Sequence, residues 1–317
     1  MSTPNIIYLL GAGASAQNKK YNNASKNFHD KLGITRMPLA DNFSEIIDSK
    51  YISTEYYESI ARVFKETTIF SKFISQHNTI DEAMRKLYLN NESELFLKYK
   101  RIISLLFFYI ESVGKYVDSR YSQFLLTLIN NKFELNSNLS ILSWNYDNQI
   151  EHAANFLKND NNNDITINSN NYYKINGSAE IKPLTVNHNE EIKGVNEILE
   201  SIPEIIFAWE ETKIDKLKNF LGASKFENEN ILVAIGYSFP TVNHFYDLEI
   251  IKKLKIKKIY YQNKDERIIE TCENLQNRFK GIFPEIKFIP ITDISRFYIP
   301  FEYYNSSIDL RPKMHLV

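Results

Sequence analysis

The stretch Asn5-Ile-Ile-Tyr-Leu-Leu-Gly-Ala-Gly-Ala-Ser15 decides the fold of this chain. Its first six residues form a short apolar run of β-prone side chains, which is typical of a strand buried on both faces of a parallel sheet. Gly11 and Gly13 follow at once, where a tight turn lets backbone N–H groups approach a pyrophosphate. Tight turns also need glycine for their own geometry, so the motif alone does not establish a dinucleotide site.

Four later segments have the same character as this first strand. They are residues 139–143, 231–235, 257–261 and 286–290, and helical patterns at 244–254 and 266–279 separate the last three. Strands that alternate with helices imply right-handed crossovers and a parallel sheet. The sequence therefore predicts an α/β fold with a Rossmann-like, doubly wound parallel sheet.

The region 41–133 has a different pattern. It contains no proline, a single glycine at Gly114, and apolar residues that recur every three or four positions. This periodicity predicts three to five packed helices. We therefore expect residues 1–40 and 134–317 to form one domain, with residues 41–133 as a helical subdomain inserted into it.

The segment after the glycine turn argues against a dehydrogenase. A dehydrogenase-type unit continues through a helix into a second strand that ends in Asp or Glu about twenty residues on. Residues 17–35 are polar and have no strand pattern. An NAD-dependent oxidoreductase is therefore disfavoured, and any dinucleotide must be held in another way.

Polar residues and glycines follow the later strands. The motifs are Leu142-Ser-Trp-Asn-Tyr-Asp147, Tyr172-Tyr-Lys-Ile-Asn-Gly-Ser178, Ala234-Ile-Gly-Tyr-Ser-Phe-Pro240 and Tyr261-Gln-Asn263. Each could be an ordinary turn, and Asp147 could simply cap a helix over 148–157. Several such motifs at the carboxyl edge of one parallel sheet favour a ligand site, because ligands of open α/β sheets bind there.

In their order along the chain, these motifs resemble those of the sirtuin-like NAD-binding family. The family's patterns are Gly-Ala-Gly-x-Ser, then Ser/Thr-x-Asn-Tyr-Asp, then Lys-x-His-Gly-Ser, then Gly-Tyr-Ser. The likeness is greatest to the branch found in bacterial anti-phage defence. The segment Met37-Pro-Leu-Ala-Asp-Asn-Phe43 is similar to the part of that branch that follows the glycine turn. Residues 79–82, Thr-Ile-Asp-Glu, are similar to its helical insertion, and the resemblance covers about residues 5–265.

The resemblance implies which residues contact NAD and what happens to it. It assigns the phosphates to Gly11, Ala12, Gly13 and Ser15, the nicotinamide ribose to Asn145 and Asp147, and the adenosine half to Gly236, Ser238 and Asn263, with Gly177 and Tyr237 in the same site. Members of the defence branch hydrolyse NAD to ADP-ribose and nicotinamide. The expected activity is therefore that of an NAD glycohydrolase, with NAD as its substrate, that depletes NAD as a regulated defence effector.

One position departs from the family pattern. Asn176 stands where the family has its catalytic histidine, and asparagine has no usable pKa for general-base catalysis. Three hypotheses follow: Asn145 and Asp147 position the water, together with Asn176; His152 or His188 replaces the base; or the chain binds without cleaving. The last makes it a non-catalytic subunit that binds NAD or ADP-ribose and gates a partner.

The composition limits which binding partners and which cellular location are expected. A net charge of −1 and a charged fraction of 24% give no reason to expect direct binding of nucleic acid or an anionic membrane. Cys272 is the single cysteine, so the four-cysteine zinc module of deacylase sirtuins cannot form, and we expect no zinc or other metal. No signal peptide or transmembrane run is evident, which predicts a cytoplasmic protein. An NAD hydrolase needs control, so a homo-oligomer or a separate sensor protein of a defence operon is the expected partner.

Overall fold

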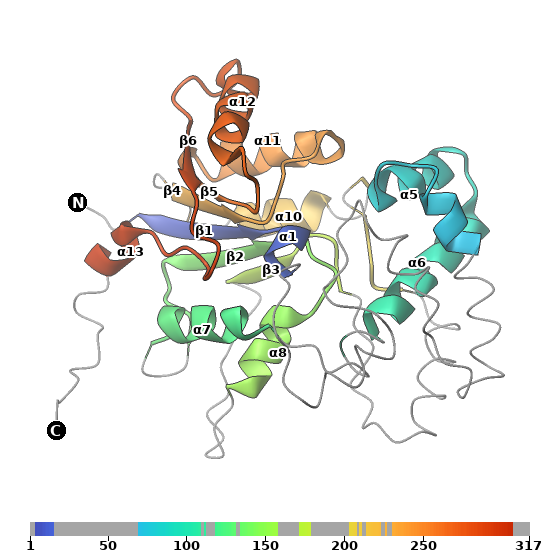
Figure 1. Cartoon of the computed structure of the whole chain (residues 1–317), viewed down its shortest axis with the longest axis horizontal. Coiled ribbons are helices and arrows are strands. Elements are labelled where there is room, and N and C mark those ends of the chain that lie inside the picture. The colour runs from blue at the N-terminus through green and yellow to red at the C-terminus, as the bar shows by residue number, and fades with distance from the viewer. Residues whose placement is uncertain are drawn as a thin grey trace.

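The fold is that of an α/β protein, seen here in a computed structural model that describes residues 4–15, 69–108, 111, 118–130, 134–157, 171–178, 203–207, 209–210, 214–222, 226 and 230–306. Six parallel strands form one sheet in the order β3-β2-β1-β4-β5-β6 (Figure 1). The strands are β1 (Asn5–Leu10), β2 (Leu139–Ser143), β3 (Tyr172–Lys174), β4 (Asn230–Ile235), β5 (Ile256–Gln262) and β6 (Lys287–Ile291). The predicted Rossmann-like fold class is confirmed, and the five strands predicted from apolar runs agree with these to within one residue at each end.

The central strand β1 explains the two layers of helices. Its side chains alternate, so that Ile7 and Leu9 belong to one core and Ile6, Tyr8 and Leu10 to the other. The first core is covered by α10 (Ile214–Leu221), α11 (His244–Lys253) and α12 (Ile268–Lys280). The second is covered by α7 (Ser119–Leu128), α8 (Gln149–Phe156) and α13 (Phe301–Ser306), so helices pack on both faces of the sheet (Figure 1).

The helices of the predicted insertion separate into two groups. The helices α5 (Ile80–Leu89) and α6 (Ser93–Phe108) share a third core with Phe70, Ile74, Ile205 and Phe207, beyond the carboxyl ends of the strands (Figure 1). By contrast, α7 packs on the sheet next to α8. None of the described helices combines the length and apolar character needed to cross a membrane.

Both neighbours of β1 are far from it in the sequence. They are β2 and β4, each in parallel register with it. In a dehydrogenase-type unit, the strand beside β1 follows it after a single helix. Here the strand in that place is β2, which begins only at Leu139. The expectation that residues 17–35 form no strand falls outside the described residues.

The turn after β1 and the turn after β4 pack backbone against backbone. The short α1 (Ala12–Ser15) begins inside the first turn, and Gly236 forms the second with φ of +61°. A Cβ atom added to Gly236 would lie 2.0 Å from the backbone nitrogen of Ala14. One added to Gly11 would lie 2.5 Å from the carbonyl oxygen of Gly236. Only glycine permits this approach.

We expect Gly236→Ala to lower the free energy of unfolding by about 2–4 kcal/mol, because it combines a left-handed backbone with a direct overlap. The matched control is Gly281→Ala, where φ is −63° and a Cβ would meet nothing within 4 Å. Urea unfolding of both variants measures the difference. Equal stabilities would show that the two turns do not pack as described.

Candidate ligand site

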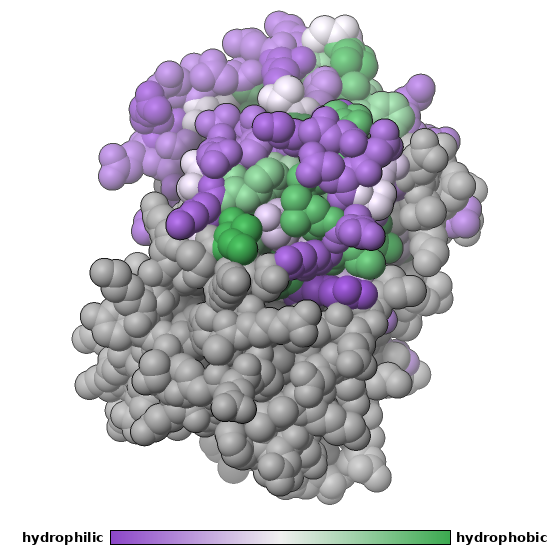
Figure 2. Space-filling model, turned by 90° about the vertical axis from the view of Figure 1, so that its right-hand side faces the viewer, coloured by the Kyte–Doolittle hydropathy of each residue, from purple (hydrophilic) through white to green (hydrophobic). Residues whose placement is uncertain are grey.

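A cavity of about 360 Å³ opens at the carboxyl edge of the sheet. It lies where β1 and β4 end side by side, while the chain continues from them toward opposite edges of the sheet. Such a topological switch point is the usual ligand site of open α/β sheets. Figure 2 faces this side of the molecule, where the described surface is mostly hydrophilic with a small group of hydrophobic residues.

The cavity brings together most of the residues expected from the sequence. Of these, Ala12, Gly13, Asn145, Asp147, Asn176, Gly236, Tyr237, Ser238 and Asn263 line it, whereas Gly11, Ser15 and Gly177 do not. Lining residues that the sequence did not assign are Thr79, Ile80, Asp81, Phe107, Trp144, Tyr146, Pro240, Val242 and Asn243. The volume is near the lower end of the range of about 300–1,000 Å³ found for ligand pockets.

The N–H groups of the glycine turn are already used by the protein. Gly11 donates to the carbonyl of Ile235 at 3.0 Å, and Gly13 donates to the carbonyl of Gly236 at 2.9 Å. Ala14 donates to Gly11 at 2.8 Å. The described geometry therefore explains the glycines by packing, and their role as phosphate donors stays a prediction.

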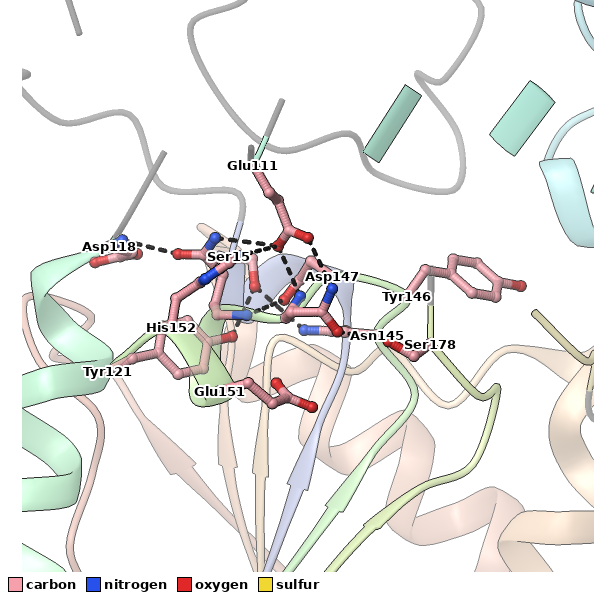
Figure 3. A network of polar contacts seen from close by, with 12 residues as sticks. Ser15, Glu111, Asp118, Tyr121, Asn145, Tyr146, Asp147, Glu151, His152 and Ser178 are labelled. Atoms are coloured by element: carbon pink, nitrogen blue, oxygen red, sulfur yellow. Dashed lines mark hydrogen bonds and ion pairs between the residues drawn. The ribbon is translucent and has the colours of Figure 1, made fainter. Parts of the chain in front are cut away.

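Ser15 fixes Asn145 rather than facing the cavity. Its buried Oγ lies 2.7 Å from Tyr121 Oη and accepts a hydrogen bond of 3.2 Å from Asn145 Nδ2 (Figure 3). Asn145 Oδ1 is buried and has no hydrogen-bond partner among the described residues. With its donor group held, this oxygen is the remaining acceptor of Asn145, a residue that lines the cavity.

Asn176 has a similar arrangement. Its Nδ2 donates to the carbonyl of Trp144 at 2.9 Å, while its buried Oδ1 has no partner within the described ranges. A buried acceptor left unpaired costs about 1–3 kcal/mol. Both residues line the cavity, so a ligand donor group or a water that reached these oxygens would satisfy them.

Asp147 serves the helix and faces the cavity. Its Oδ1 accepts a hydrogen bond of 3.3 Å from the N–H of Gln149, in the first turn of α8, which agrees with the capping interpretation. Burial raises the pKa of Asp147 to about 7, the negative charge of Glu111 adds to the rise, and Lys174 and Ser15 oppose it. The carboxyl group is thus poised to exchange a proton near neutral pH.

Glu111 and Lys174 hold the loop that carries Asp147, and the sequence assigned neither of them a role. Glu111 accepts from the N–H of Asn148 at 2.6 Å and from Gln149 Nε2 at 3.3 Å. Lys174 Nζ donates to the carbonyl of Asp147 at 2.6 Å and to Asn148 Oδ1 at 2.8 Å. Lys174 ends β3 and belongs to the motif 172–178 noted in the sequence. No sequence pattern around Glu111 predicts a role for it.

His152, one of the two histidines considered as a base, does not line the cavity. It lies on α8 outside the cavity lining, with Nε2 3.8 Å from Glu111 Oε1 (Figure 3). Burial alone would lower the pKa of His152, but Glu111, Glu151 and Asp147 outweigh burial and raise it. His188, the other histidine considered, lies outside the described residues.

Comparisons with known proteins identify no family for this chain. No protein-family model matches the chain, and no curated protein matches it. Within the described ranges no group of three or more His, Cys, Asp or Glu side chains is arranged to hold a metal ion.

A buried carboxylate supports the cavity wall from behind. The ring of Tyr237 stacks on Trp144 at 5.6 Å, and its hydroxyl donates to Asp247 Oδ1 at 2.8 Å. Asp247 is 1% exposed, and its Oδ2 has no partner among the described residues. Burial raises the pKa of Asp247 to about 8, against the opposing effects of Tyr237 and Arg278.

Because the pKa of Asp247 is higher in the folded chain than in the unfolded chain, folding binds a proton, and stability is lost as pH rises from about 4 to about 8. We expect Asp247→Asn to reduce the fall in unfolding free energy between pH 5 and pH 8 by at least about 1.4 kcal/mol, one pKa unit. Asp293→Asn is the control, because the Ser295 hydroxyl lowers the pKa of that exposed carboxyl. Urea unfolding at both pH values measures the effect, and an unchanged pH dependence in Asp247→Asn would contradict it.

Proposed function

We propose that this chain binds NAD in the cavity and hydrolyses the bond between nicotinamide and ribose, giving ADP-ribose and nicotinamide. The observation that carries the proposal is the convergence of Asn145, Asp147 and Asn176 on one cavity at the switch point of the sheet. The resemblance of the same motifs to the sirtuin-like NAD-binding family supplies the substrate.

Asp147 would act as the base of this reaction. A water attacks C1′ of the ribose, the bond from C1′ to the pyridinium nitrogen breaks, and its electron pair leaves with nicotinamide as a neutral molecule. The proton of the water passes to Asp147, whose pKa of about 7 suits transfer at neutral pH. A carboxylate is a sufficient base here, so the family's histidine is not required.

Asn145 would position the water or a ribose hydroxyl. Its Nδ2 is bonded to Ser15, so the amide is held in one orientation with Oδ1 as the remaining acceptor. A side chain that is already fixed before the reaction raises the rate by orienting the reactants. It does not have to lose conformational freedom on the way to the transition state. Asn176 would accept a second hydrogen bond from the substrate in the same way.

The alternative is a non-catalytic subunit that binds NAD or ADP-ribose and gates a partner protein. The observation in its favour is that Asn176 donates to the backbone of Trp144 and therefore holds the wall of the cavity. This function keeps the same cavity and ligand but needs no base. The two functions differ in turnover, which separates them directly.

In either case the resemblance to anti-phage defence suggests control by assembly. An NAD hydrolase that was always active would deplete its host, so we infer that a homo-oligomer or a separate sensor protein regulates the site. This inference depends on analogy with the family rather than on a surface of the molecule.

The first test of hydrolysis uses the two asparagines. We expect Asn145→Ala to lower NAD turnover by about 10²-fold or more, because it removes the acceptor that the hydrogen bond to Ser15 holds in place. Asn176→His restores the family's base, and we expect it to raise turnover. Release of nicotinamide, measured by chromatography with and without neighbouring proteins of the operon, reports both. Binding of NAD without turnover in the wild type and in Asn176→His would favour the gating subunit.

The second test uses the pH profile. We expect the rate to rise with pH through about 7 as Asp147 loses its proton, and Asp147→Asn to lower it by about 10²–10⁴-fold. Glu111→Gln removes a negative charge that raises the pKa of Asp147, so the midpoint should move to lower pH. The exposed Glu134→Gln is the charge-matched control. A midpoint that stays in place in Glu111→Gln would exclude Asp147 as the base.

A further inference from the structure

The helical group contributes one carboxylate to the cavity. Thr79 Oγ1 accepts a hydrogen bond from the N–H of Glu82 at 3.1 Å, so α5 begins at Ile80 and Asp81 lies in its first turn. Thr79, Ile80 and Asp81 all line the cavity. Asp81 is thus placed opposite the strand ends by a capped helix whose other side packs in the third core.

Asp81 also contacts the loop that carries the expected catalytic residues. Its Oδ1 accepts a hydrogen bond of 3.4 Å from Tyr146 Oη, and Tyr146 stands between Asn145 and Asp147. Asp81 therefore belongs to the end of the cavity where β2 terminates rather than to the end at β5. The resemblance places the nicotinamide half of NAD at this end.

The charge of the cavity lining is negative. Asp81 and Asp147 are the carboxylates among the described lining residues, and no Lys, Arg or His belongs to that set. Lys174 does not line the cavity, and its Nζ bonds to the carbonyl of Asp147 and to Asn148 Oδ1. Two carboxylates favour a cation beside them, because charges in a partly desolvated cavity are weakly screened.

Aromatic side chains surround the same end of the cavity. Phe107, Trp144, Tyr146 and Tyr237 line it, and the rings of Phe107 and Tyr146 lie 6.0 Å apart at 51°. Aromatic faces attract cations, and flat rings pack against them. A flat cationic ring satisfies both the carboxylates and the aromatic wall.

We propose that this end of the cavity selects the positively charged pyridinium ring of oxidised NAD over ligands that lack the charge, and that Asp81 is the residue responsible for the selection. The proposal deepens the function proposed above and rests on it for the identity of the ligand. NADH has an uncharged ring and ADP-ribose has no ring at that end, so both lose the attraction. Cleavage discharges the ring, and the neutral nicotinamide is then held less strongly.

The ionisation of Asp81 is compatible with this role. Burial raises the pKa of Asp81 to about 6, against the hydrogen bond from Tyr146. The group is therefore mostly ionised at pH 7.5. Asp81 is also half-buried, so its charge is screened less than a charge at the surface and attracts a cation more strongly.

The test compares ligands that differ in ring charge. Isothermal titration at pH 7.5 on the full chain uses carba-NAD, which keeps the cationic ring and resists hydrolysis, together with NADH and ADP-ribose. We expect the wild type to bind carba-NAD about tenfold or more tightly than NADH. Asp81→Asn should weaken binding of carba-NAD alone and reduce the preference to less than about threefold.

Three further variants separate charge from structure. Asp81→Glu keeps the charge and should keep most of the preference, whereas Glu94→Gln removes an exposed charge from the same helical group and should change nothing. Circular dichroism and thermal melting establish that Asp81→Asn is folded. Tyr146→Phe keeps the ring and the carboxylate but removes a hydrogen bond that lowers the pKa of Asp81, so the preference should fall less than in Asp81→Asn.

The outcomes distinguish this proposal from the proposed function. Equal affinities of the wild type for carba-NAD and NADH, or an equal loss of all ligands in Asp81→Asn, would overturn charge selection even if NAD is hydrolysed. Charge selection without turnover would leave the inference standing and favour the gating subunit. If the wild type binds none of the three ligands, both proposals fail.

Discussion

The close approach of two turns, one after β1 and one after β4, is the constraint on which the rest of the molecule depends. The N–H of Gly11 bonds to Ile235, the N–H of Gly13 bonds to Gly236, and no side chain fits between them. Parallel strands of a doubly wound sheet diverge in their connections at this point. Because the turns are fixed by backbone contacts, the cavity beside them has one wall that does not depend on side-chain packing.

A buried polar network transmits this fixed geometry to the candidate catalytic residues. Ser15, at the end of α1, bonds to Tyr121 of α7 and to Asn145 after β2, so elements far apart in sequence meet at one hydroxyl. Glu111 and Lys174 then hold the following loop by hydrogen bonds to its backbone. Networks of this kind specify one arrangement only when their members are satisfied. The two amide oxygens that stay unpaired among the described residues belong to Asn145 and Asn176, and both residues line the cavity.

Sequence reasoning recovered the strands and their edge because both have local causes. Buried runs such as 231–235 and the glycines that end them are visible one segment at a time, and the carboxyl edge of a parallel sheet collects whatever follows them. It assigned Ser15 to phosphate because the hydroxyl belongs to the glycine motif, yet the burial of Ser15 depends on Tyr121, more than a hundred residues later. Asp81 lies in the segment 79–82 noted in the sequence, but neither it nor Glu111 was assigned a role in the site, for the same reason. Their place at the site follows from how a helical group packs, and no local pattern encodes that.

The buried acidic groups at the site lower the stability of the folded chain, and this cost is an argument that they serve a function. Asp81, Asp147 and Asp247 all have raised pKa values, and burial is the largest cause in each case. A core chosen for stability alone would hold apolar residues at these positions, because a buried carboxyl costs free energy whether it is ionised or neutral. Local violations of this kind concentrate where a protein binds or transforms a ligand. Asp247 stabilises no ligand directly, but its hydrogen bond fixes Tyr237, and Tyr237 fixes Trp144 by stacking. Asp81 and Asp147 line the aromatic end of one cavity, and that is the end where a cationic ring would compensate their charge.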